Sequence, residues 1–191
     1  MDFHFKLILF VDKDGVNQKM YASEFLKYKN SSSEIKLDKD NSTIELFYNG
    51  TSYISSNWNL GRPDWLLPQI ENALNKLENH HLVLVRSAVI EGSELPYMVL
   101  EPNEKSVKIS LIVFDDYEIE QIFPAGPFSQ KSKELYDYFF NYRDRFFNDL
   151  DSTIQNNPDL TDYFKNIEVP ADKLINDLET MIKELTEIIS L

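Results

Sequence analysis

The chain has 191 residues, of which 42% are hydrophobic and 13% aromatic, and this is enough apolar material to build a packed core. Its 32 acids against 19 lysines and arginines give a net charge of -13, which disfavours binding to nucleic acid and to anionic lipid surfaces. No cysteine occurs, which excludes disulfides, thiol nucleophiles and cysteine-based zinc sites.

The chain begins with a predicted β-strand. Apolar residues alternate with other residues from Phe3 to Val11, and the turn signal Asp-Lys-Asp-Gly at 12–15 ends the run. We expect a second strand at residues 16–21. The apolar run 7–11 is too short for a signal peptide and has no cationic segment before it, so the sequence predicts a soluble, cytoplasmic protein.

A connection and a hairpin are expected next. The segment 31–42 is polar and rich in Ser, Asp and Lys, which is typical of an exposed connection, with at most a short strand at 35–37. Asn49-Gly50 then lies between two β-prone runs. Both residues tolerate a positive φ, so this pair predicts a type I′ hairpin turn.

A helix and three strands are predicted in the middle of the chain. The helix is expected at about residues 65–79, with Asp64 as its N-cap and Pro68 near its first turn. Its apolar positions follow helical spacing: Trp65, Leu66, Ile70, Leu74 and Leu77. Strand-like runs at 82–90, 96–103 and 105–123 follow, joined by short connections that indicate an antiparallel meander.

The last third of the chain has a helical pattern. One apolar stripe consists of Leu135, Phe139, Tyr142, Phe146 and Leu150. A second consists of Leu174, Leu178, Met181, Leu185 and Ile188, on an amphipathic helix of about 20 residues with Pro170 near its first turn. This helix either packs on the sheet or on a neighbouring helix, or forms the seam of a homodimer through these five residues.

These elements predict an α+β fold for the whole chain, 1–191, as a single domain. We expect an antiparallel sheet made of hairpins and a meander, with one inserted helix and a C-terminal helical segment packed on it. Residues 1–125 are mainly β, and residues 129–191 are helical. Whether this helical segment is a subdomain of its own stays open.

The residues that usually carry catalysis are sparse. The five glycines are too far apart for a dinucleotide-binding fingerprint or a P-loop, and no Gly-x-Ser-x-Gly elbow occurs. His80 and His81 are candidates for a metal ligand or a general base, but a pair at the exit of a helix more often has a structural role. We therefore predict no catalytic residue, no cofactor and no metal site.

Four carboxylates crowd into FDDYEIEQIF at residues 114–123. If the strand continues through this stretch, Asp116, Glu118 and Glu120 share one face, while Asp115 and Tyr117 share the other. The stretch is either a solvated strand face at the edge of a sheet or a docking face for a basic protein. The docking interpretation makes these five residues the partner-binding candidates.

The acid excess is concentrated late in the chain. Residues 101–120 carry six acids against two bases, and residues 151–191 carry nine against three, whereas residues 1–40 are neutral. Such a distribution steers a basic partner into contact and raises its association rate.

The layout of hairpins, the helix DWLLPQIENALNKL and a meander ending in SVKISLIVF resembles the small acidic immunity proteins of bacterial polymorphic-toxin and contact-dependent inhibition systems. The resemblance covers roughly residues 1–125 and rests on size, acidity, lack of cysteine and α+β order. It implies a protein that binds a cognate toxin domain, often a basic nuclease, and blocks its active site or substrate surface. It carries no motif, so no residue's role is transferred.

Two other functions are compatible with the sequence. One is a carboxylate- or metal-dependent hydrolase that uses Asp115, Asp116 and Glu118 with His80 or His81. The other is a homo-oligomeric scaffold built through the C-terminal helix.

Overall fold

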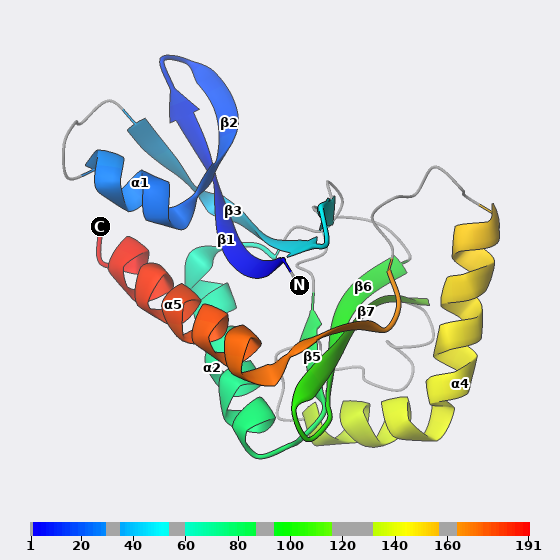
Figure 1. Cartoon of the computed structure of the whole chain (residues 1–191). Helices are drawn as coiled ribbons and strands as arrows, with labels where there is room; N and C mark the ends of the chain where they lie inside the picture. Colours follow the sequence, from blue (N-terminus) through cyan, green and yellow to red (C-terminus); the bar gives the residue numbers. More distant parts are fainter. Residues whose placement is uncertain (1, 30–34, 54–59, 87–93, 116–131, 157–163) are drawn as a thin grey trace.

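The chain folds into two antiparallel sheets with helices packed around them (Figure 1). The computed structural model describes residues 2–29, 35–53, 60–86, 94–115, 132–156 and 164–191. The first sheet has the strand order β2-β1-β3-β4, and the second has the order β5-β6-β7-β8. This is the α+β class that the sequence predicts, although the strands form two sheets instead of one.

Two tight hairpins build the first sheet. Its strands are β1 (Phe3–Lys13), β2 (Val16–Tyr21), β3 (Ile35–Tyr48) and β4 (Thr51–Tyr53). The turn between β3 and β4 consists of Asn49 and Gly50, whose φ angles are 49° and 87°. Positive φ at both central residues is the type I′ pattern, so the predicted hairpin is confirmed. Asp14 and Gly15 join β1 to β2 in the same way, with φ angles of 56° and 78°.

The expected connection at 31–42 is wrong for its second part, because β3 begins at Ile35. This half of β3 pairs with the end of β1, beyond a register shift between Leu9 and Val11. Several of its side chains are exposed, so its composition resembles that of a loop although its backbone is paired. A short helix that the sequence did not predict, α1 (Ala22–Lys29), buries Ala22 and Phe25.

The second sheet contains the predicted meander. Its strands are β5 (Val83–Arg86), β6 (Glu94–Pro102), β7 (Ser106–Asp115) and β8 (Ile167–Pro170). The first three pair in chain order and antiparallel, which confirms the meander. The sequence did not predict β8, whose four residues pair with the beginning of β7.

The longer helices are α2 (Pro63–Glu78), α4 (Ser132–Asn156) and α5 (Ala171–Ile189). Helix α2 begins two residues earlier than expected, with Arg62 as its N-cap and Pro63 at its first position. Asp64 is therefore a first-turn residue and not the cap, and its carboxylate forms an ion pair with Arg62 at 2.8 Å. Pro68 falls in the second turn, deeper in the helix than predicted. Pro170 is the N-cap of α5.

Helix α4 lies across the molecule from α1 (Figure 1) and contacts β7 of the second sheet. The rings of Phe139 and Phe146 stack at 5.8 Å, and both are buried. Arg143 forms an ion pair with Glu101 of β6 at 2.8 Å. Tyr142, which the sequence placed on the apolar stripe, is instead 45% exposed.

One hydrophobic core joins both sheets to α2 and α5, which lie side by side in Figure 1. The apolar stripe of α5 is buried in it: Leu174, Leu178, Met181, Leu185 and Ile188. These are the residues of the homodimer alternative, and all five already contact the chain's own core. A dimer seam through them would require α5 to leave that core.

Helix α5 also covers an edge of the first sheet. Strand β2 pairs with β1 only from Ile8 onward, so before that residue one edge of β1 has no partner among the described strands. The Phe5 amide at this edge donates a hydrogen bond to a carboxylate oxygen of Asp177 on α5, at 2.9 Å. The Asp177 carboxylate thereby accepts the hydrogen bond of a backbone amide that could otherwise pair with another strand.

Candidate functional site

The predicted docking stretch lies mostly outside the described residues. Asp115 is the last residue of β7, where it is in register with Glu94 of β6. Asp116, Tyr117, Glu118 and Glu120 are not among the residues that the structure describes. The role of this stretch in partner binding stays a prediction.

The histidine pair terminates α2 through its backbone. His80 has a φ of 56°, and its amide donates to the Leu77 carbonyl at 3.0 Å. The His81 amide donates to the Lys76 carbonyl at 2.8 Å. This is the Schellman arrangement, in which a left-handed residue after the helix lets two amides satisfy the last carbonyls. Both histidines are exposed, and the favoured structural interpretation agrees with this geometry.

The described residues of the hydrolase alternative, His80, His81 and Asp115, do not converge. Val83, two residues after His81, is level with Ile109 across the second sheet, because both pair with Leu100. Asp115 lies six residues further along β7 than Ile109. At about 3.3 Å per residue, the beginning of β5 next to His81 and the Asp115 end of β7 are about 20 Å apart. Within the described parts of the chain, no group of three or more His, Asp or Glu side chains is arranged to hold a metal ion.

A buried carboxylate on the first sheet was missed by the sequence analysis. Glu45, three residues before the end of β3, is only 5% exposed. The Tyr21 hydroxyl donates a hydrogen bond to one carboxylate oxygen, and His4 Nε2 lies 3.0 Å from that same oxygen. The Ser52 hydroxyl donates to the other oxygen at 2.5 Å. Because these partners come from β2, β1 and β4, one side chain links all four strands of the sheet.

The hydrogen bonds decide the charge state of this cluster. Burial raises the pKa of Glu45, but the hydrogen bonds from Ser52, Tyr21 and His4 together lower it by more than burial raises it. The pKa of Glu45 therefore lies below its ordinary value. Burial and the hydrogen bond to Glu45 raise the pKa of Tyr21 to about 12. At neutral pH the cluster therefore holds an ionised glutamate and a protonated tyrosine.

This arrangement favours a structural role over catalysis. A general acid needs a pKa raised toward the working pH, whereas that of Glu45 is lowered. Ser52 gives its hydrogen bond to Glu45 and not to His4, so the two do not form a nucleophile–base pair. The carboxylate acts as an acceptor that binds three neighbouring strands together.

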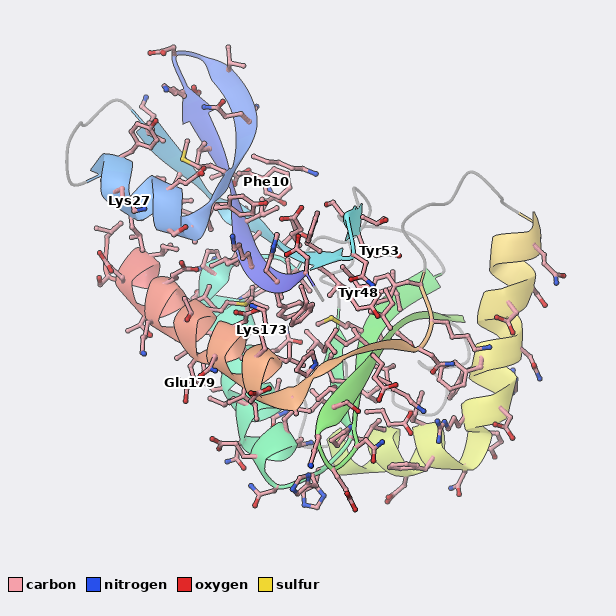
Figure 2. All side chains as sticks on the ribbon, viewed as in Figure 1. Phe10, Lys27, Tyr48, Tyr53, Lys173 and Glu179 are labelled. Atoms are coloured by element: carbon pink, nitrogen blue, oxygen red, sulfur yellow. The ribbon has the colours of Figure 1, made fainter. Side chains whose placement is uncertain are left out.

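Aromatic rings and lysines surround the carboxylate on the same face of the sheet. His4 stacks on Phe47 with ring centres 4.8 Å apart, and Lys6 Nζ lies 5.0 Å from the centre of the Tyr21 ring. Figure 2 shows Phe10 of β1 on the side of the sheet away from α1. The only sequence signal for the cluster is Glu45 itself, which is the single charged residue in the run 42–48.

The acid excess of the described residues is concentrated on α2 and α5. Together the two helices carry eight acids against three lysines, a net charge of −5, whereas 2–29 and 35–53 together carry seven of each. Six of the eight acids are exposed: Asp64, Glu71, Glu78, Asp172, Glu179 and Glu187. We call these six residues the acidic helix pair. Figure 2 shows one of them, Glu179, on the outer side of α5.

An exposed tryptophan lies at the beginning of α2, one of the two helices that carry the acidic helix pair. Trp65, in the first turn of α2, is 49% exposed. The Arg62 guanidinium lies 5.4 Å from the centre of its ring and also pairs with Asp64. Trp and Arg are the residue types that most often dominate the energetics of protein interfaces.

A comparison with known protein families, curated proteins and solved structures finds no match for this chain. Among the described residues, no helix combines the length and the apolar character needed to cross a lipid bilayer.

Proposed function

We propose that this chain is a non-catalytic acidic protein that binds and neutralises a basic protein partner, as immunity proteins do. The observation that carries the proposal is the acidic helix pair, on which six exposed carboxylates lie beside one exposed lysine, Lys183. The two helices that present these carboxylates are held in the core by their apolar faces. The charged surface is thus presented on a rigid support.

Electrostatics explains how such a surface selects its partner. A concentrated negative field attracts a positively charged surface before contact, which raises the association rate and disfavours acidic or neutral proteins. Charge at the rim of an interface contributes less to final affinity than buried anchors do. We assign the anchor role to Trp65, the exposed aromatic residue beside Asp64.

The predicted docking stretch belongs to the same proposal. Asp115, Asp116, Tyr117, Glu118 and Glu120 would add carboxylates and an aromatic ring to the surface that meets the partner. The compartment that we propose is the cytoplasm, where an immunity protein would meet a toxin domain that acts inside the cell.

A non-catalytic role agrees with the chemistry of the Glu45 cluster. Its carboxylate accepts three hydrogen bonds from neighbouring strands and has a lowered pKa, which suits a structural acceptor. No observation favours the hydrolase, whose predicted residues lie far apart where the structure describes them.

Co-purification tests the proposal. The chain would be expressed with the product of a neighbouring toxin-like gene and analysed by size-exclusion chromatography at low salt. We expect one peak that contains both proteins and weakens as salt is added, because salt screens exposed charges. Separate elution at low salt would contradict the proposal.

A further inference from the structure

We infer that Glu45 is an acid-sensitive clasp, which holds β2 and β4 on the first sheet while it is ionised and releases them when it is protonated. The inference concerns the conformation of the first sheet and is independent of the proposed partner. It rests on the geometry of one buried carboxylate and on the edge position of the two outer strands, each of which pairs with one described strand.

Each outer strand has one side chain that packs against the core, Met20 of β2 and Tyr53 of β4, while most of its other residues are exposed. Strand β2 pairs with β1 alone, and its first four residues are exposed. Strand β4 has three residues, of which Thr51 and Ser52 are exposed, and pairs with β3 alone. The Tyr21 hydroxyl ties β2 to the carboxylate, and the Ser52 hydroxyl ties β4 to it. Each outer strand is therefore joined to the centre of the sheet by one side-chain hydrogen bond to the same group.

Protonation removes the acceptor capacity on which these bonds depend. An ionised carboxylate offers two oxygens that only accept, whereas a protonated one carries a hydrogen and accepts more weakly. The three donors around Glu45 then compete for fewer acceptor sites in a buried position. Because the donors of this part-buried cluster lose acceptor strength, protonation weakens the attachment of β2 and β4 to the centre of the sheet.

The sign of the linkage follows from the direction of the pKa shift. The pKa of Glu45 is lower in the folded chain than its ordinary value of 4.5. Its contribution to stability is therefore complete above about pH 4.5 and is lost as the pH falls through the folded pKa. Tyr21 titrates at about 12, so it keeps its proton throughout this window.

The charged groups around Glu45 do not cause the same loss of stability at low pH. On β1, His4 contacts the carboxylate and Lys6 is opposite it in register. On α1, the charge of Glu24 helps to raise the pKa of Tyr21, and on α5, the charges of His4 and Lys6 act to lower the pKa of Asp177. Burial raises the pKa of Asp177, so its protonation favours the folded state where that of Glu45 opposes it.

The same opposite sign holds for Glu184, the other half-buried carboxylate of α5. Burial raises the pKa of Glu184 against the lowering effect of Lys6. Acidification therefore weakens the outer strands of the first sheet without weakening the docking of α5 through these two carboxylates. Within the first sheet, the acid response is therefore expected at β2 and β4.

Hydrogen exchange of the whole chain, read by peptide or by residue between pH 7 and pH 3, tests the clasp. In the wild type, protection factors in β2 and β4 should fall by up to about tenfold per pH unit below the folded pKa, the slope for one proton. Protection in β5, β6 and β7 should persist to lower pH. Equal midpoints for both sheets would overturn the inference.

Two variants separate the clasp from general acid unfolding. Glu45→Gln imitates the protonated carboxyl, so β2 and β4 should already be weakly protected at pH 7, while the exposed control Glu179→Gln should match the wild type. Tyr21→Phe removes one donor, which should raise the pKa of Glu45 and move the midpoint of opening to higher pH. Full protection in Glu45→Gln at pH 7 would overturn the inference. If Glu45→Gln does not fold, an unchanged midpoint in Tyr21→Phe would overturn it.

Discussion

His80 occupies a left-handed backbone conformation that glycine adopts at lower cost. For a residue with a Cβ this conformation costs about 1–2 kcal/mol. Glycine avoids this strain, but part of the gain in stability is lost because glycine also increases the conformational entropy of the unfolded chain. The sequence places the histidine pair at a helix exit, and this predicted its structural role. The left-handed angle of 56° at His80 could not be predicted, because helices end in several ways.

We expect His80→Gly to raise the free energy of unfolding by about 0.5–1 kcal/mol, because it relieves the left-handed strain and keeps both backbone hydrogen bonds. Denaturant unfolding measures the change. His81→Gly is the matched control, since His81 has no positive φ and gains nothing from glycine. A stabilised His81→Gly with a destabilised His80→Gly would contradict this account of the helix end.

The Glu45 cluster shows where residue-level prediction stops. Its partners lie 41, 24 and 7 positions away along the chain, so no local spacing brings them together. The β3–β4 hairpin brings Ser52 to Glu45, whereas His4 and Tyr21 reach it through the pairing of β1 with both β2 and β3. The sequence signal, one acid within an apolar strand, indicates a buried carboxylate but cannot name its donors.

Local turn chemistry made the hairpins predictable at the scale of elements. Asn49-Gly50 and Asp14-Gly15 adopt positive φ at both positions, as their residue types favour. The polar half of β3, the helix α1 and the strand β8 were not predicted, because each depends on neighbours distant in sequence. Strand β8, for example, pairs with β7 across about sixty residues of chain.

Gly50→Ala should lower the free energy of unfolding by about 1–2 kcal/mol. The loss comes from backbone strain alone, because a side chain is disfavoured at a φ of 87°. There is no steric clash, since a Cβ at this position would meet no atom within 4 Å. Thermal or denaturant unfolding measures the loss. Asn49→Gly, at the other left-handed position of the turn, is expected to cost nothing. An unchanged stability in Gly50→Ala would mean that the hairpin contributes little to the cooperative fold.

The apolar stripe of α5 gives a prediction that separates core packing from self-association. Leu178 is completely buried, so Leu178→Ala should cost about 2–5 kcal/mol of stability through lost contacts and a cavity. Ile189, which is 44% exposed, is the matched control and should cost about 0.5 kcal/mol or less when changed to Ala.

The unfolding midpoint of the wild type should also be independent of protein concentration, because the stripe is used within one chain. Light scattering together with thermal unfolding over a wide concentration range measures this. A midpoint that rises with concentration, and that loses this dependence in Leu178→Ala, would support the homodimer instead.

At the scale of the whole molecule, charge and apolar burial are arranged on the same helices. The inner faces of α2 and α5 complete the core, and their outer faces carry a net −5 of the chain's -13. The sequence predicted an acid excess at the C-terminal helix, but not that α2 would lie beside α5 and extend it. That juxtaposition requires the packing of helices almost a hundred residues apart.

Three variants with the same change in net charge distinguish a local docking surface from a general effect of charge. The first neutralises part of the acidic helix pair: Glu71→Gln, Glu179→Gln and Glu187→Gln. The second neutralises the predicted docking stretch: Asp116→Asn, Glu118→Gln and Glu120→Gln. The control neutralises acids of the first sheet and α1: Asp14→Asn, Glu24→Gln and Asp40→Asn.

The association rate with the product of the neighbouring toxin-like gene, measured by stopped flow for the wild type and the three variants from low to high salt, tests the central claim most directly. We predict a fast rate that falls steeply with salt, because the Debye length shrinks from about 30 Å at 0.01 M to about 8 Å at physiological ionic strength. The helix-pair variant should associate several-fold more slowly than the first-sheet control. No association at low salt, or equal slowing in the helix-pair variant and the control, would contradict the account.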